Sequence, residues 1–225
     1  MQVLKFLWDK LPKKTRFKVN QKLGRNLVPT YYPEYIDNKM LFIHIPKSAG
    51  SSIGKVLIGD KKPGHWTTDD FMAMNKARFN EYYKFCFVRN PWDRVVSSFF
   101  YLKKGGNNPK DLEFSQTELK NINSFEEFVY SLNENENLQN WIHFIPQNHF
   151  ITDGYGRINV DYVGKFESLD QDFSLVLEKI GLPQIELPKV NKSKHKNYQE
   201  YYTDETKEII GNLYREDISL FNYTF

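Results

Sequence analysis

The chain has 225 residues, of which 40% are hydrophobic and 26% are charged, and its formal net charge at pH 7 is +3. This composition is typical of a soluble globular protein and allows one sizeable domain with a buried core. The net charge is too small to indicate a nucleic-acid partner. Cys86 is the only cysteine, which excludes an intrachain disulfide and a cysteine metal cluster.

The first 38 residues are predicted to form a basic arm followed by an aromatic lead-in. Residues 1–25 hold eight lysines and arginines against one acid, Asp9. Such an arm either contacts an anionic membrane or polymer or is simply solvated. The sequence has no run of about 18 apolar residues and no secretory signal, so we expect a cytoplasmic protein with, at most, a peripheral membrane contact through the arm. We place the main domain at residues 39–225.

A buried strand followed by a loop of small residues is the most informative part of the chain. Residues 40–45 are apolar and predict the strand, and the apolar segment 53–58 predicts a helix. Between them, after Pro46, the loop runs Lys47, Ser48, Ala49, Gly50, Ser51 and Ser52. A strand, a small-residue loop and a helix present backbone N–H groups to an anion, and the lysine and serines add charge and donors. We therefore predict a site for phosphate or sulfate.

The order of residues in this loop disfavours an ordinary ATPase or GTPase. The Walker A motif places its lysine after the glycines and follows it with a hydroxyl residue for magnesium. Here Lys47 comes before Gly50, so the lysine enters from the start of the loop.

A second buried strand, predicted at residues 84–88, leads into Arg89. Asn90 is a good N-cap and begins a predicted helix that carries Ser97 about two turns further on. The planar, always charged guanidinium of Arg89 suits a pair of phosphate oxygens. Taken alone, Arg89 is better explained by an ion pair with an acid across the sheet, and Ser97 by a satisfied helix hydroxyl. With the first loop in the same chain, we interpret both as phosphate ligands.

Strands that alternate with helices predict an α/β domain with a mainly parallel sheet flanked by helices, in a P-loop-like three-layer fold. Because ligands bind at the carboxyl ends of parallel strands, Lys47 and Arg89 are expected to share one crevice. The other predicted elements are a helix capped by Thr67 or Thr68, a variable loop at 105–123, a helix opened by a capping box at Ser124, a third strand at 158–166, a helix from Ser168 to Gly181, a basic loop at 189–198, and one or two helices at 203–221.

Two segments together resemble the paired signature of the carbohydrate sulfotransferases. Residues 44–53 resemble the loop that holds a 5′-phosphosulfate, and residues 87–97 resemble the motif that holds a 3′-phosphate. The similarity extends through 145–147, 160–167 and 214–221, and so covers roughly residues 40–225.

The resemblance implies a sulfotransferase that uses 3′-phosphoadenosine 5′-phosphosulfate (PAPS) and needs no metal. The acceptor it implies is a hydroxyl of a polysaccharide, oligosaccharide or glycolipid. Carried over by position, the 5′-phosphosulfate ligands are Lys47, Ser48, Ala49, Gly50, Ser51 and Ser52, and the 3′-phosphate ligands are Arg89 and Ser97.

Sulfuryl transfer needs in-line positioning and stabilisation of the charge that develops on the leaving oxygen. Lys47 is the predicted source of that stabilisation. His65 is the candidate base, with an exposed loop histidine as the equally weighted alternative, whereas His44 is interpreted as a core residue. Glu167 could contact substrate, orient Lys47 or form a structural ion pair.

Two other functions stay open from the sequence. One is a P-loop-like kinase that uses ATP and magnesium, which the position of Lys47 disfavours. The other is a non-enzymatic module that binds polyanions through the basic arm and the lysines of residues 189–196.

Overall fold

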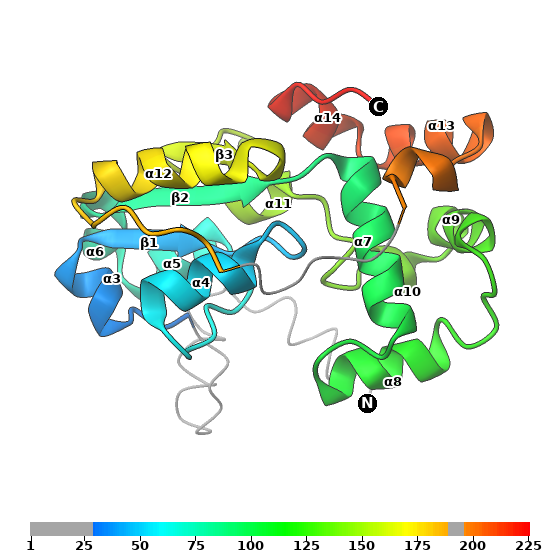
Figure 1. Ribbon diagram of the computed structural model, residues 1–225, viewed down its shortest axis with the longest axis horizontal. Helices are drawn as coiled ribbons and strands as arrows, with labels where there is room; N and C mark the ends of the chain where they lie inside the picture. Colours follow the sequence, from blue (N-terminus) through cyan, green and yellow to red (C-terminus); the bar gives the residue numbers. More distant parts are fainter. Residues whose placement is uncertain (1–28, 189–195) are drawn as a thin grey trace.

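The computed structural model describes residues 29–188 and 196–225. Three parallel strands form its sheet in the order β1 (Met40–Ile43), β2 (Tyr83–Val88) and β3 (Tyr162–Lys165). Phe42 of β1 lies opposite Phe85 of β2, and Phe85 lies opposite Tyr162 of β3. Helices flank this sheet (Figure 1), so the predicted α/β fold with a parallel sheet is confirmed.

The helices form two groups (Figure 1). The helices around the sheet are α3 (Pro33–Asp37), α4 (Gly50–Ile58), α5 (Thr68–Met74), α6 (Lys76–Glu81), α11 (Asn148–Ile151) and α12 (Leu169–Lys179). The helices beyond the carboxyl ends of the strands are α7 (Pro91–Lys103), α8 (Pro109–Thr117), α9 (Phe125–Glu134), α10 (Glu136–Gln139) and α13 (Asp204–Leu213). After α13, helix α14 (Arg215–Phe221) returns to contact α11. Two short 3-10 turns complete the described elements, at Phe166–Ser168 and Tyr198–Tyr201.

Buried apolar side chains form two clusters, one for each group of helices. The sheet cluster contains the strand residues together with Phe173 of α12. The helical cluster contains one face of α7, including Val95 and Phe99, packed with Phe128 of α9. Since β2 belongs to the first cluster and α7 to the second, the residues that join them lie at the junction of the two cores. Those residues are Arg89 and Asn90.

Helix α7 begins and ends as the sequence predicts. The side chain of Asn90 accepts a hydrogen bond from the Trp92 N–H at 3.1 Å, and Pro91 occupies the first helical position. The helix ends at Lys103 and is followed by two glycines with positive φ, Gly105 and Gly106. Local capping chemistry therefore fixes both ends of the element that carries Ser97.

The predicted loop at 105–123 is wrong, because it contains α8. The side chain of Asn108 caps this helix by accepting from the Asp111 N–H at 3.0 Å, and Pro109 is its first residue. The helix buries Asp111 and Phe114. Residues 105–109, which lead into the helix, are glycine, asparagine and proline and have the composition of a turn, and the helix has too few apolar positions to give a helical period.

Smaller differences concern the ends of elements. The first and third strands are shorter than predicted, at Met40–Ile43 and Tyr162–Lys165. Thr67, not Thr68, caps α5 with a full capping box. Ser124 caps α9, but Glu127 accepts from the N–H of Asn123 rather than from that of Ser124, so only half of the predicted box forms.

Two predicted basic segments lie wholly or mainly outside the described residues, namely the arm at 1–25 and the loop at 189–198, of which 189–195 is not described. The aromatic lead-in is described in part, and Tyr31 and Tyr35 are buried in the sheet cluster. Within residues 29–188 and 196–225, no helix has the length and apolar character needed to cross a membrane.

Candidate active site

The loop between β1 and α4 is tightly bent. Lys47 has φ +69° and Ala49 has φ +61°, in the left-handed region that residues other than glycine rarely adopt. A side chain at Gly50 would collide with the imidazole of His44, because an added Cβ would lie 1.8 Å from His44 Cδ2. Backbone strain of this kind concentrates at ligand-binding sites.

The bent loop leads directly into the N-terminus of α4, a nine-residue helix. The N–H groups of a first helical turn have no partners within the helix, and the helix dipole favours an anion beside them. Gly50, Ser51 and Ser52 form that first turn. The predicted strand, loop and helix are therefore confirmed, whereas the role of each residue as an anion ligand stays a prediction.

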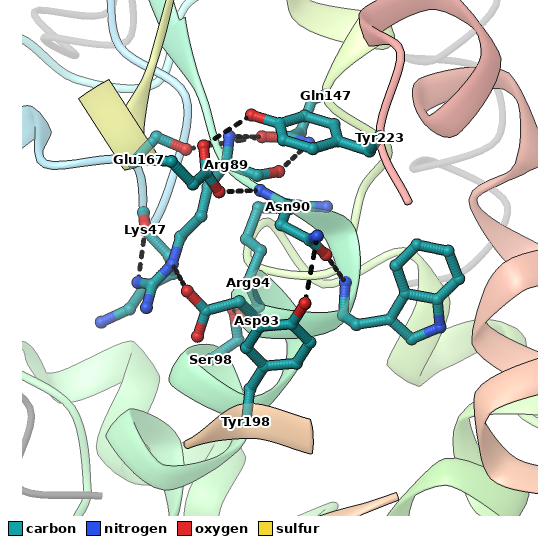
Figure 2. A network of polar contacts seen from close by, with 12 residues as sticks. Lys47, Arg89, Asn90, Asp93, Arg94, Ser98, Gln147, Glu167, Tyr198 and Tyr223 are labelled. Atoms are coloured by element: carbon teal, nitrogen blue, oxygen red, sulfur yellow. Dashed lines mark hydrogen bonds and ion pairs between the residues drawn. The ribbon is translucent and has the colours of Figure 1, made fainter. Parts of the chain in front are cut away.

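Arg89 joins the two predicted motifs. Its Nη1 donates to the carbonyl oxygen of Lys47 at 3.3 Å, and its Nε donates to Asp93 Oδ2 at 2.7 Å (Figure 2). The guanidinium also stacks over the Phe166 ring, 4.1 Å from its centroid. A guanidinium has five N–H donors, and these contacts use two of them. Arg89 therefore keeps donors for an anion while it is held rigidly beside the first loop.

Gln147 links the backbone of Arg89 to the first loop. Its side-chain oxygen accepts from the Arg89 N–H at 2.9 Å, and its Nε2 donates to the Arg89 carbonyl oxygen at 2.9 Å. The same oxygen lies 3.5 Å from the hydroxyl of buried Ser48. Asp217, also fully buried, accepts from the backbone N–H groups of Gln147 and Asn148. The family resemblance seen in the sequence extends over Gln147 and Asp217, but it gave no role to either residue.

Glu167 holds the start of α7. One carboxylate oxygen accepts from the Asn90 N–H at 2.7 Å, and the other accepts from the Tyr223 hydroxyl at 2.9 Å (Figure 2). The Asn90 side chain donates to the carbonyl oxygen of Thr224 at 2.8 Å. Glu167 has no described contact with Lys47, so of its predicted roles neither the orientation of Lys47 nor an ion pair is supported.

Ser97 and Arg94 lie on α7 with different surroundings. The hydroxyl of buried Ser97 makes no hydrogen bond to any residue in the described part of the chain, which leaves it available to a ligand. Arg94 is fully buried and donates to the carbonyl oxygens of His143 and Ile145. Arg94 therefore ties α7 to the segment that precedes Gln147.

Three histidines gather beside the first loop. The Nδ1 of His65 lies 3.1 Å from the carbonyl oxygen of His44, and the Nδ1 of His44 lies 3.1 Å from that of Gly64. The ring centroid of His65 is 4.2 Å from that of His44 and 6.3 Å from that of His143. A carbonyl oxygen can only accept, so each Nδ1 in these pairs carries the proton and Nε2 keeps its lone pair.

Burial also favours the neutral imidazoles. It lowers the pKa of His65, with a smaller opposing contribution from the His44 carbonyl oxygen. Burial and the neighbouring His65 and Lys47 lower the pKa of His143 to about 2. His65 is therefore neutral at pH 7, with the lone pair of Nε2 available to accept a proton. The interpretation of His44 as a satisfied side chain agrees with its bond to Gly64.

Lys47 is largely shielded from water. Its Nζ lies over the ring of Tyr101, 3.9 Å from the centroid. No acidic group in the described part of the chain lies within 4 Å of this Nζ. Burial and then the charge of Arg89 lower the pKa of Lys47 to about 8, and Asp111 opposes them. A desolvated ammonium group that forms no ion pair with the described residues is well suited to an anionic ligand.

The structure thus brings Lys47 and Arg89 together at the carboxyl edge of the sheet, as the parallel topology predicted, and places His65 beside His44, which follows β1. A profile of the sulfotransferase family matches residues 36–224. The chain belongs to the sulfotransferase family. The resemblance carried by the two motifs is confirmed.

Two relatives of this sulfotransferase illustrate how far the similarity reaches. An uncharacterized protein of Archaeoglobus fulgidus is 35% identical over 130 residues, which is 56% of this chain and 90% of that protein. Human carbohydrate sulfotransferase 9 is 27% identical over 173 residues, which is 66% of this chain but only 39% of the human protein. No solved structure matches this sulfotransferase significantly.

The described residues of this sulfotransferase hold no group of three or more histidine, cysteine, aspartate or glutamate side chains arranged to bind a metal ion. The sequence missed Asp111 because α8 was taken for a loop, and it missed Tyr101 because the contact of that residue with Asp111 depends on α8. It missed Tyr223 because hydrogen bonds between distant loops leave no periodic signal.

Proposed function

We propose that this sulfotransferase moves the sulfuryl group of PAPS to a hydroxyl group of a carbohydrate by in-line transfer. The observation that carries the proposal is the hydrogen bond between Arg89 and the Lys47 carbonyl oxygen, which joins two anion-binding segments at one sheet edge. A donor with a phosphosulfate at one end and a phosphate at the other needs two such segments.

The first segment holds the 5′-phosphosulfate and the second holds the 3′-phosphate. The first comprises Lys47, Ser48, Ala49, Gly50, Ser51 and Ser52. Arg89 contributes its remaining N–H donors to the 3′-phosphate, and Ser97 contributes its unpaired hydroxyl. The position of the loop at the N-terminus of α4, where the helix dipole favours an anion, and the desolvated ammonium of Lys47 support this assignment.

Transfer forms a bond between sulfur and the acceptor oxygen while the bond from sulfur to the bridging oxygen breaks. Lys47 stabilises the negative charge that develops on the bridging oxygen, which leaves with 3′,5′-adenosine bisphosphate. His65 Nε2 takes the proton of the acceptor hydroxyl. Both assignments follow from chemistry that needs no metal, since lysine and backbone N–H groups meet the leaving charge.

A carbohydrate acceptor is favoured by the similarity to human carbohydrate sulfotransferase 9, which covers 66% of this chain. The acceptor can be tested with radiolabelled PAPS offered to a panel of polysaccharides and glycolipids, with simple phenols and alkyl alcohols as the comparison. Label transferred to phenols alone would overturn the carbohydrate assignment and leave sulfuryl transfer intact.

The donor should be tested first, by calorimetric titration of 3′,5′-adenosine bisphosphate in EDTA. We expect metal-independent binding that Arg89→Ala weakens by about 10- to 100-fold, because a charged hydrogen-bonded contact is lost. The matched control is Arg157→Ala, which removes an exposed arginine paired with Asp153 outside the site. Lys47→Ala should abolish transfer, and a fully active Lys47→Ala enzyme would contradict the mechanism.

The same titration distinguishes the two other functions left open by the sequence. Tight binding of ATP only with magnesium would favour a kinase over a sulfotransferase. Binding of polyanions that weakens steeply with salt, and that Lys47→Ala leaves unchanged, would favour a non-enzymatic module.

A further inference from the structure

Tyr101 lies under the ammonium group of the proposed catalytic lysine. It is on α7, four residues after Ser97, and its ring centroid is 3.9 Å from Lys47 Nζ. An aromatic face attracts a cation, and it does so more strongly where water is excluded. Among the described residues, no other aromatic ring lies over this ammonium group.

The orientation of Tyr101 is fixed by a buried carboxylate. Its hydroxyl donates to Asp111 Oδ2 at 2.7 Å and accepts from the Asn107 N–H at 2.9 Å. Asn108 Nδ2 donates to the same Asp111 oxygen at 2.6 Å. Asp111 is only 2% exposed. Two hydrogen bonds therefore hold the Tyr101 hydroxyl, and a third holds the Asp111 carboxylate, whose burial costs it its hydration.

The turn between α7 and α8 is built to bring this carboxylate back over α7. Gly106 has φ +63°, and a Cβ added there would lie 2.2 Å from Asp111 Cβ. Only glycine allows this close approach without a shift of the neighbouring chain. The Tyr101–Asp111 pair is thus the product of a specific turn rather than an incidental surface contact.

Several charged and titratable groups surround Lys47. Arg89 at the end of β2 opposes its positive charge, and Asp111 of α8 favours it. The imidazoles of His44, His65 and His143 are neutral, and their pKa values are lowered in part by Lys47. Asp111 is therefore the acidic group in the described residues that counteracts both burial and Arg89 at this lysine.

We propose that Tyr101, held by Asp111, is a positioning residue that keeps the Lys47 ammonium group charged and aligned with the anion-binding loop. This inference rests on the proposed function of Lys47. The ring supports the ammonium from one side and excludes water there, and Asp111 supplies the compensating charge without forming an ion pair that would hold Lys47 away from the donor.

The test measures Lys47 directly, by competitive labelling of lysines with isotopic acetic anhydride across a pH range. The variants are Tyr101→Leu, Tyr101→Phe and Asp111→Asn, and exposed Lys179 in the same digest is the internal reference. Asp111→Asn should move the labelling midpoint of Lys47 to lower pH, because a nearby negative charge is lost. Tyr101→Leu should raise the limiting labelling rate by uncovering the amine, while Tyr101→Phe should keep it near the wild-type value.

Turnover supplies the second readout. Tyr101→Leu should lower kcat by about 2- to 30-fold, the range expected for a lost cation–π contact, while the Kd of 3′,5′-adenosine bisphosphate stays near its wild-type value. Tyr101→Phe should recover most of kcat. Tyr162→Phe is the matched control, since its hydroxyl also donates to a carboxylate, Asp172, in a different part of the fold.

The outcomes separate this inference from the proposed function. If 3′,5′-adenosine bisphosphate does not slow the labelling of Lys47 in the wild-type protein, the proposed function fails. If it does, but the Tyr101 and Asp111 variants label and turn over like the wild type, the positioning role alone is wrong. A kcat lost equally in Tyr101→Phe and Tyr101→Leu, with labelling unchanged, would also overturn it.

Discussion

At the scale of single residues, a backbone contact determines what His65 can do. The carbonyl oxygen of His44 fixes the proton on Nδ1, and burial lowers the pKa of the ring. Together they make Nε2 a proton acceptor at neutral pH. A solvent-exposed histidine with the same sequence neighbours would have neither property, which is why the sequence left the two readings of His65 equally weighted.

His65→Asn isolates the role of the base, because the asparagine amide can still donate to the His44 carbonyl oxygen. We expect kcat to fall by about 10²- to 10⁴-fold, with little change in the affinity for 3′,5′-adenosine bisphosphate. In the wild-type enzyme the acid limb of kcat/KM should lie below pH 6.5, since the pKa of His65 is lowered, and this limb should disappear in the variant. Steady-state kinetics across pH measures both effects.

Exposed His149, changed to alanine, serves as the control for loss of an imidazole elsewhere on the surface. A His65→Asn enzyme that keeps its turnover would rule out His65 as the base and direct attention to the other histidines of the cluster.

At the scale of elements, the turn between α7 and α8 requires glycine at position 106. Gly106→Ala would place a left-handed residue and a Cβ against Asp111 at once. Gly156 is the matched control, because it also has positive φ, +76°, but nothing lies within 4 Å of an added Cβ. Comparing the two alanine variants therefore separates the cost of a positive φ from the cost of a collision with Asp111.

We expect Gly156→Ala to lower the free energy of unfolding by about 1–2 kcal/mol, the cost of a left-handed residue. Gly106→Ala should lower it further and should also reduce kcat, because α8 carries the carboxylate that fixes Tyr101. Urea unfolding and steady-state kinetics on both variants provide the measurements. Equal losses of stability in the two variants, with full activity, would show that α8 moves without consequence for the site.

The elements also show where sequence reasoning succeeds. Asn90 and Pro91 predicted the start of α7, and the rule for parallel sheets predicted that Lys47 and Arg89 would meet, as their hydrogen bond confirms. These predictions rest on local capping and on topology, both of which are written in short stretches of sequence. The position of Asp111 depends instead on how α8 folds back, and a turn-like composition conceals that helix.

The partners of Arg89 and Asn90 lay beyond prediction for a related reason. Gln147 is 58 residues from Arg89, and Glu167 is 77 residues from Asn90. Such contacts join loops with no repeating pattern, so only the assembled fold reveals them. The family resemblance covered residues 145–147 and 160–167, which contain Gln147 and Glu167, but it did not indicate which backbone groups these side chains bind.

At the scale of the whole molecule, three histidines, of which His143 is buried and His44 and His65 are half-buried, affect stability as well as chemistry. The pKa values of His44, His65 and His143 are all lowered in the folded protein. As pH falls, the unfolded chain therefore binds protons before the folded protein does. Their contribution to stability is complete above the unfolded pKa near 6.5 and is lost as pH falls below it.

The free energy of unfolding should consequently decline below pH 6.5, by as much as about 1.4 kcal/mol per pH unit for each histidine that the unfolded chain protonates first. Urea midpoints between pH 7.5 and 5 measure this slope. His143→Gln should flatten it, and His149→Gln, outside the cluster, is the control. A slope that is the same in wild type and His143→Gln would contradict the assignment.

The contacts of Asn90 have a consequence for the order in which the protein is made. A nascent chain that has emerged as far as α7 already contains Lys47, Arg89 and Ser97, but it lacks Glu167 and Thr224, which hold Asn90 in place. Because domains are synthesised from the N-terminus, we expect a ribosome-bound chain that exposes only the two motifs to bind the donor more weakly than the full chain, in which Glu167 and Thr224 hold Asn90. Assembly of the site therefore depends on segments that are synthesised well after the two motifs.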